Sequence, residues 1–328
     1  MSGQAGAPRA RYFSKEPKES LLIRFSTAAR KYWFIYLLAI PGLLFLLVFS
    51  YAPMYGVVLA FKDFKMNLGV MGSPWVGLYH YRELFADPAF IQAFKNTVII
   101  NIYNLIFGFT FNVFLALMIN ELQMKRLKSV VQTCVYLPYF LSWVIFAGLV
   151  QVFLQAPVPG DVGGVVNQVI QAMGGEPIDF MKRPEMFRGI LVITNIIKTA
   201  GYSTIIYLAA VAGVDPALYE AASIDGANRR DMLLHITIPR ILPSVAVMFL
   251  LSISQLFLSN FDQVYNLYNN FVLNTGDVLS TYIYRISLGG GGEFELSTAA
   301  NLLLNVMGLI ALVVTNRFVK KLDVMGIF

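Results

Sequence analysis

Residues 33–60 read WFIYLLAIPGLLFLLVFSYAPMYGVVLA and contain no Asp, Glu, Lys or Arg. A helix of about 20 apolar residues crosses the hydrocarbon core of a bilayer, so this stretch is long enough to span one. The whole chain shares its character, since 57% of the 328 residues are hydrophobic and 13% are charged. Soluble domains carry about 25% charged residues. The sequence therefore predicts an integral membrane protein.

Five further apolar runs follow the first. Together the six runs lie at about 33–61, 97–118, 130–153, 190–211, 244–260 and 298–319. Their length favours helices, so we expect an all-α membrane protein of six transmembrane helices. An even number of spans puts both termini on one side. The expected organisation is an N-terminal tail at 1–32, a six-span domain at 33–319 and a C-terminal tail at 320–328.

Basic residues are unevenly divided between the two sides of these spans. Sixteen Lys and Arg lie in the tails, the second loop and the fourth loop, against eight in the other loops. The side richer in Lys and Arg is usually cytoplasmic, so both termini and the fourth loop are expected inside the cell. This bias explains the net charge of +6 without nucleic acid. Residues 21–31 mix apolar and basic side chains and favour either an interfacial helix on membrane lipid or a disordered tail.

The fourth loop reads VDPALYEAASIDGANRRDMLLHITIPRILP over residues 214–243. Asp215 suits the N-cap of a helix and Pro216 its first position. Gly226 suits the position just after the helix ends. Pro239 and Pro243 are expected to end the second helix of the loop before the fifth span. These signals predict a helix, a turn and a second helix, which on their own also fit a plain cytoplasmic linker.

A more specific pattern lies within this loop. Glu220-Ala221-Ala222, Asp225-Gly226-Ala227, Ile236, Pro239 and Pro243 resemble the EAA loop of binding-protein-dependent ABC import permeases. The resemblance implies a coupling helix that docks on a separate ATP-hydrolysing subunit. It assigns the docking to Glu220, Ala221, Ala222, Asp225, Gly226, Ala227 and Pro239, with Glu220 facing a basic group and Gly226 turning where a side chain would obstruct.

The resemblance extends along most of the chain and narrows the family. The segments 51–56 (YAPMYG), 61–64 (FKDF), 72–78 (GSPWVGL), 96–97 (NT), 120–122 (NEL), 136–138 (YLP) and 205–210 (IIYLAA) are similar to the branch of these permeases that imports polysaccharide fragments. Tyr139 departs from that branch, which commonly has His after the Pro. An oligosaccharide substrate, including acidic uronate sugars, is what this resemblance implies.

The resemblance also implies an assembly. It comprises a second, different permease subunit, two ATPase subunits and an extracytoplasmic sugar-binding protein, in a bacterial inner membrane. No Gly is followed by Lys in the chain, so it lacks the phosphate-binding loop of ATPases. We therefore expect no catalytic residue and no cofactor here, with ATP and Mg bound by the partners. His80 and His235 lack metal-ligand spacing, and we expect no metal site.

Polar residues within the apolar runs mark candidate positions along a substrate path, because they are costly in hydrocarbon unless they face an interior. Lys198 and Tyr202, with Thr194, are spaced along the fourth span, and Ser252, Gln255, Ser259 and Asp262 along the fifth. For these two sets we favour a sugar path. Asn101, Asn104 and Asn112 in the second span, and Asn301, Asn305 and Gly308 in the sixth, rather suggest contacts between helices.

Lys198 is the one basic residue well inside a span. Three roles fit it: an ion pair with Asp262, a side chain that reaches an interface, or attraction of an acidic sugar. The alternative to an ABC permease is an ion-coupled secondary transporter. Such transporters usually carry Asp, Glu or His inside their spans, and here Asp262 near a span end is the single such residue.

Overall fold

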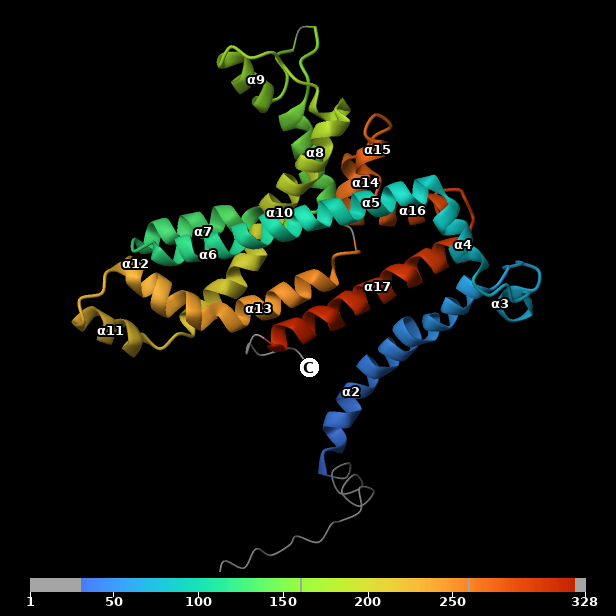
Figure 1. The fold of residues 1–328 in the computed structure, drawn as a ribbon, viewed down its shortest axis with the longest axis horizontal. Helices are drawn as coiled ribbons and strands as arrows, with labels where there is room; N and C mark the ends of the chain where they lie inside the picture. The colour runs from blue at the N-terminus through green and yellow to red at the C-terminus, as the bar shows by residue number, and fades with distance from the viewer. Residues whose placement is uncertain (1–30, 160, 259, 322–328) are drawn as a thin grey trace, which may run out of the picture. The chain divides into compact units, whose positions relative to one another are not determined.

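The computed structural model describes residues 31–159, 161–258 and 260–321, and these are organised as helices (Figure 1). Within them the isolated β-bridges Lys62–Trp75 and Val158–Asp161 are the extended pairings. The elements are α2 (Trp33–Leu46), η1 (Leu47–Tyr51), η2 (Ala52–Phe61), α3 (Gly69–Gly72), α4 (Tyr79–Ala86), α5 (Pro88–Tyr103), η3 (Asn104–Phe109), α6 (Thr110–Glu121), α7 (Lys125–Phe140), α8 (Trp143–Leu154), α9 (Val165–Ala172), η4 (Phe180–Lys182), α10 (Pro184–Ala212), α11 (Pro216–Ile224), α12 (Arg229–Met232), η5 (Leu233–Thr237), α13 (Ile238–Ser254), α14 (Phe261–Leu267), α15 (Leu273–Gly276), α16 (Leu279–Ile286) and α17 (Phe294–Lys321). The all-α prediction is confirmed.

The predicted spans correspond to long apolar helices, with one exception. Five stretches are long and apolar enough to cross a membrane, namely Trp33–Phe61, Pro88–Glu121, Pro184–Ala212, Arg229–Ser254 and Phe294–Arg317. The sixth exists if α7 and α8 count as one span, and these two are bent by 108°. The run 130–153 is therefore not one continuous helix, because the chain leaves the helical conformation at Leu141 and Ser142.

The chain divides into two units, Met1–Gly56 and Val57–Phe328, and the division falls inside the first span. The described part of the first unit is residues 31–56, which form α2, η1 and the start of η2, and none of these residues is buried within the chain. A helix that is apolar on every side suits contact with lipid or with another subunit. The predicted tails lie outside the described residues up to residue 30 and from residue 322, and so does nearly all of the predicted interfacial helix.

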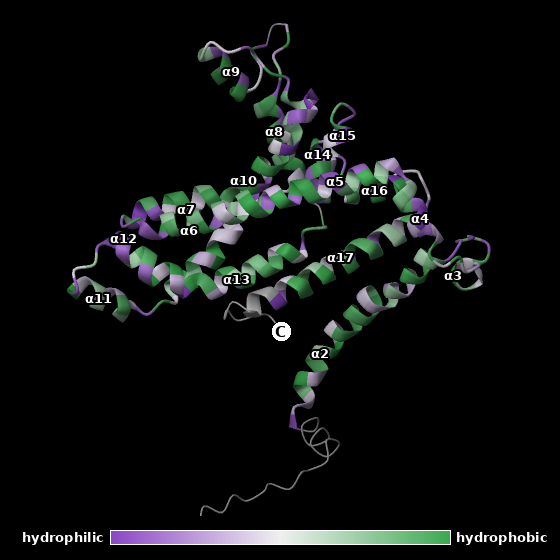
Figure 2. Cartoon of the chain, in the orientation of Figure 1, coloured by the Kyte–Doolittle hydropathy of each residue, from purple (hydrophilic) through white to green (hydrophobic). Residues whose placement is uncertain are grey.

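The second unit has three clusters of buried apolar side chains. One joins α8, α10 and α14 around Phe187 and Leu191, and another joins α4, α5, α16 and α17 around Phe90 and Ala299. The third lies where α11 meets the ends of α10 and α13. Hydrophobic residues run along α5, α13 and α17, as expected of membrane helices, whereas hydrophilic residues gather near α3 and α12 (Figure 2).

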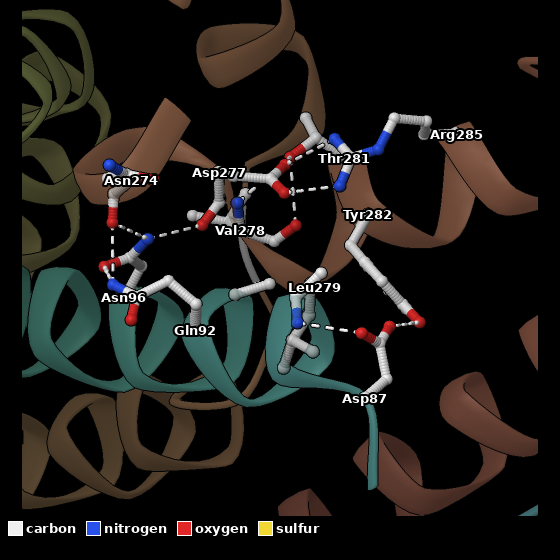
Figure 3. A network of polar contacts seen from close by, with 12 residues as sticks. Asp87, Gln92, Asn96, Asn274, Asp277, Val278, Leu279, Thr281, Tyr282 and Arg285 are labelled. Carbon is white, nitrogen blue, oxygen red and sulfur yellow. Dashed lines mark hydrogen bonds and ion pairs between the residues drawn. The ribbon is translucent and has the colours of Figure 1, made fainter. Parts of the chain in front are cut away.

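Polar contacts hold α5 to the segment that contains α15 and α16 (Figure 3). The Asn96 side chain is fully buried and donates from Nδ2 to the carbonyl oxygens of Asn274, at 3.1 Å, and of Asp277, at 2.8 Å. The next residue, Thr97, accepts at Oγ1 from the Leu279 backbone at 2.9 Å. Buried amides need such partners, so these bonds fix the register between the two segments.

The same segment carries two strongly bound side chains outside the candidate spans. The Tyr282 hydroxyl donates to Asp87 Oδ2 at 2.6 Å, and burial, followed by this bond, raises the pKa of Tyr282. The Arg285 guanidinium forms a two-pronged pair with Asp277, with Nη2 2.7 Å from Oδ2, and this bond raises the pKa of Arg285. The first contact ties α16 to Asp87 between α4 and α5, and the second joins α16 to Asp277, which lies just before it.

Candidate coupling loop and substrate pathway

The loop after α10 begins with a capped helix, as its sequence indicates. Asp215 is the N-cap of α11, and its Oδ1 accepts from the backbone N–H of Ala217 at 3.0 Å. Pro216 takes the first helical position, where a missing N–H costs no bond. The helix therefore starts at a sharply defined residue.

The helix ends as sharply, at a turn built on Gly226. This residue has φ +80°, and its N–H donates to the carbonyl of Ser223 at 3.2 Å, while that of Ala227 donates to Ala222 at 2.9 Å. These two bonds form a Schellman motif, which favours glycine because the left-handed conformation strains other residues. A Cβ at Gly226 would meet no atom of this chain within 4 Å. Within this chain, backbone conformation and not steric obstruction is therefore what requires the glycine.

One face of α11 is fixed to the base of the membrane helices. Leu218 and Tyr219 pack against the buried cluster of Val211, Val214 and Ile241. The Tyr219 hydroxyl also lies 2.9 Å from Oγ1 of Thr237, a side chain that is 1% exposed. These contacts tie α11 to the residues that lead into α13.

The other face of α11 is open. Glu220, Ala221 and Asp225 are exposed, and Ile224 is 87% exposed although it is strongly apolar. Of the other residues assigned to docking, Gly226 and Pro239 are exposed, and Ala222 and Ala227 are half-buried. The open face of α11 thus presents one exposed apolar side chain, Ile224, between acidic residues.

A cavity of about 410 Å³ lies between α5, η3, α10, α13 and the segment that leads into α14. Amides and hydroxyls make up most of its polar lining. They belong to Thr97, Asn101, Asn104, Asn112, Asn195, Thr199, Ser203, Tyr207, Ser252, Gln255, Asn260 and Gln263. Among the described residues, no charged side chain lines it. Such a lining offers donors and acceptors to hydroxyl groups but no counter-charge.

Several of these amides also join helices. Asn101 donates to the carbonyl of Leu256 at 2.8 Å, and Asn195 donates to Asn104 Oδ1 at 3.2 Å. The Asn112 Oδ1 atom, in contrast, is buried without a partner. Asn101, Asn104 and Asn112, which the sequence assigned to helix contacts, therefore line the cavity as well.

The family described as binding-protein-dependent transport system inner membrane component matches residues 108–324, which is more than half of the chain and includes α11. The chain belongs to this family. It is thus an inner-membrane transport component. Membership in this family supports the import permease over the alternative, an ion-coupled secondary transporter.

Two relatives of this permease match it over most of its length. It is 40% identical over 325 residues to the polygalacturonan/rhamnogalacturonan transport system permease protein YteP of Bacillus subtilis (strain 168), covering 99% of this chain and 98% of YteP. It is 37% identical over 306 residues to Protein LplB of the same strain, covering 93% of this chain and 94% of LplB.

Solved structures agree in fold. A chain of a bacterial ABC transporter involved in the import of the acidic polysaccharide alginate matches with a TM-score of 0.82 and 38% identity, over 91% of this permease and 99% of that chain. A chain of a bacterial alginate ABC transporter in complex with alginate pentasaccharide-bound periplasmic protein matches with a TM-score of 0.83 and 37% identity, over 93% and 100%.

The structure brings together part of the pathway residues that the sequence of the permease suggested. Ser252 and Gln255 of the fifth-span set line the cavity. Asp262 is exposed and lies outside the lining, and Ser259 falls outside the described residues. Gly308 of the sixth-span set lies where a Cβ would be 3.1 Å from the Ser254 carbonyl, which is a contact between helices.

The fourth-span residues lie on a neighbouring face of α10. The cavity is bordered by Asn195, Thr199 and Ser203, each one residue after Thr194, Lys198 and Tyr202 respectively. Tyr202 is 51% exposed and stacks on Tyr139, with ring centroids 4.9 Å apart.

The ion pair between Lys198 and Asp262, one of the three roles that the sequence left open for Lys198, is absent from the described residues. Lys198 Nζ instead donates to the carbonyl oxygens of Pro138, Tyr139 and Leu141, at 3.2, 3.1 and 2.6 Å. No charge pattern could show this, since the acceptors are backbone atoms. The predicted docking set also omits Ile224 on the open face of α11 and Tyr219 on its packed face, because the motif gives no weight to their side chains.

Proposed function

We propose that this permease forms the membrane path for acidic oligosaccharides together with a second, different permease subunit. Two ATPase subunits, which bind ATP and Mg, drive the transport, and an extracytoplasmic sugar-binding protein delivers the substrate. The names of YteP and of the alginate transporters support the substrate class. The observation that carries the proposal is α11, a helix capped at both ends, fixed on one face and open on the other.

The mechanism follows from how α11 is attached. The ATPase binds the open face with Glu220 and Ile224, and its closure on ATP moves α11 as a rigid body. The Tyr219–Thr237 contact and the packing on Ile241 pass this movement to α13. Because α13 carries Ser252 to the cavity wall, the movement changes access to the cavity. No covalent chemistry takes place in this chain.

Selection of the acidic group is assigned to the binding protein. The cavity lining is uncharged over its described residues, so a carboxylate passing through it meets amides and hydroxyls but no cation. Such groups exchange hydrogen bonds with sugar hydroxyls one after another and hold none of them strongly. The permease thus passes the sugar through a neutral path. The excess of Lys and Arg in the tails and in the second and fourth loops supports a cytoplasmic position for both termini and α11.

Purification from native membranes through a tag on the permease tests the assembly. We expect two ATPase chains and one unlike permease to co-purify. Proteoliposomes with binding protein and an oligogalacturonate on one side, and ATP and Mg on the other, should accumulate the sugar. Uptake by the permease alone without ATP would overturn the proposal.

Ile224 provides a direct test of the coupling surface. The variant Ile224→Asp should lower ATP-driven uptake by roughly tenfold or more, because burying an apolar side chain of this size contributes about 1.5–3 kcal/mol and a buried carboxylate is worse. The side chain touches little of its own chain, so thermal stability of the isolated permease should not change. Ile224→Leu is the matched control and should transport normally, and equal uptake by both variants would contradict the docking of this face.

A further inference from the structure

Lys198 lies near the middle of α10 and is 6% exposed, in the part of the chain that faces the bend between α7 and α8. Helices α7 and α10 approach each other closely at this point. One turn further along α10, a Cβ at Gly201 would be 2.6 Å from the Val135 carbonyl and 2.7 Å from Tyr136 Cα, both in α7. The backbone of α7 therefore runs directly against α10 where the Lys198 side chain extends.

All three N–H donors of Lys198 are used. They reach the carbonyl oxygens of Pro138 and Tyr139 in the last turn of α7 and of Leu141 in the break. An ammonium group has three donors and no acceptor, so none is left for a substrate carboxylate. The sequence left open that Lys198 attracts acidic sugars. In the structure, Lys198 has no free N–H donor with which to bind one.

The ammonium group of Lys198 also lies near aromatic rings of both helices that flank the break. It lies 5.8 Å from the ring centroid of Tyr139 in α7, and 5.2 Å and 5.9 Å from those of Trp143 and Phe146 in α8. A cation over an aromatic face is attracted by the ring quadrupole, more strongly where water is excluded. A single side chain thus touches the end of one helix and the first turn of the next.

A break within a membrane span needs such a partner. The last carbonyls of a helix have no intrahelical donor, and hydrocarbon offers none. At the start of α8, Ser142 supplies the N-cap by accepting from the Ile145 N–H at 3.3 Å. At the end of α7, Lys198 supplies the donors, and its charge also complements the negative end of the α7 dipole.

We propose that Lys198 is a positioning residue that holds the break between α7 and α8 and thereby sets the place of α8, without binding the transported sugar. The consequence for the cavity follows through α14. Gln151 of α8 donates to the Asn266 carbonyl of α14 at 2.8 Å, and Gln263 of α14 lines the cavity and donates to the Leu191 carbonyl of α10 at 2.6 Å. Displacing α8 would therefore move one wall of the cavity.

Distance measurement between spin labels tests this directly. Cys134 is the sole cysteine of the chain and is exposed on α7, and a second cysteine can be introduced as Val152→Cys on α8, where the side chain is 61% exposed. Labels are placed in the complete complex, with cysteines removed from the other subunits. We expect one narrow distance distribution for the parent protein and for Lys198→Arg, which keeps the donors and the charge. Lys198→Met, which loses both, should give a broadened or shifted distribution.

Uptake of an oligogalacturonate in proteoliposomes is measured on the same variants. Lys198→Met should lose roughly tenfold or more of the transport rate, and Lys198→Arg should recover most of it. Lys95→Met, which removes a Lys that is exposed on α5, controls for the loss of one positive charge and should behave like the parent. Should Lys198→Met fail to assemble, Lys198→Gln, with two donors and no charge, takes its place with the same expectation in weaker form.

An unchanged distance distribution in Lys198→Met or Lys198→Gln, combined with lost uptake, would overturn the proposal and return Lys198 to the substrate path. An unchanged distribution with normal uptake would overturn it as well. The distance readout does not depend on the substrate. It therefore remains decisive even if the transport function proposed above is wrong, which the absence of uptake by the parent complex would reveal.

Discussion

Replacing Gly226 with proline is expected to abolish ATP-driven uptake while the permease still inserts and assembles its membrane helices. Proline holds φ near −65°, whereas Gly226 has φ +80°, and proline has no N–H to donate to the Ser223 carbonyl. Proline therefore cannot take part in this Schellman turn, and the loop must leave it. The end of α11 then unwinds, and Ile224 and Asp225 lose their fixed place toward the ATPase. A loss of more than about a hundredfold in uptake is expected.

The controls for this prediction use the same position. Gly226→Asn should keep most of the uptake, because Asn tolerates the left-handed conformation. Gly226→Ala should lie between, since that conformation costs an ordinary residue about 1–2 kcal/mol and open space surrounds the Cβ. The measurement is uptake together with ATP hydrolysis stimulated by loaded binding protein. If Ala is as damaging as Pro, the requirement is steric and arises from a partner surface, and the conformational argument fails.

The coupling loop was largely predictable because its signals are local. Asp215 and Pro216 start a helix and Gly226 ends it through contacts within a few residues, and the structure contains each of them. The membrane class was predictable for a related reason, since an uncharged run such as 33–60 has few alternatives. What such signals omit is the packing of the base, where Tyr219 meets Thr237 across 18 residues.

The break at Leu141 and Ser142 was not predictable from hydropathy. The run 130–153 is apolar on both sides of it, and Pro138 lies within α7 without ending it at once. The bend depends on donors that come from α10, some sixty residues later in the chain. A Lys in mid-span signals only that a partner exists, and the partner proves to be the backbone of another helix.

The cavity face of α10 shows a different limit. Residues i, i+4 and i+8 lie on one face of a helix. The set that starts one residue later lies together on a second face, about 100° around the helix from the first. The sequence offers polar side chains in both registers, and Thr194, Lys198 and Tyr202 are the more conspicuous chemically. Only packing against α5 and α13 identifies Asn195, Thr199 and Ser203 as the set that lines the cavity.

The difference between these two faces of α10 leads to a prediction of a large and specific effect on transport. Ser203→Leu should reduce oligogalacturonate uptake by about tenfold to a hundredfold. A cavity of about 410 Å³ can accept the side chain, so the fold should persist. Sugar hydroxyls that pass it, however, lose their partner, and a buried polar group without one costs about 1–3 kcal/mol. Ser203→Ala, which leaves the path open, should have a much smaller effect.

The neighbouring residue supplies the decisive control. Tyr202 is half exposed and stacks on Tyr139 outside the cavity lining, so Tyr202→Leu should keep most of the uptake although it removes a larger aromatic group. Both variants are compared in the same proteoliposomes at matched permease content and matched basal ATP hydrolysis. A sugar path along the face of Tyr202 would give the opposite order, with Tyr202→Leu inactive and Ser203→Leu near normal. That result would mean that the cavity described here serves helix packing and that the substrate crosses the membrane elsewhere.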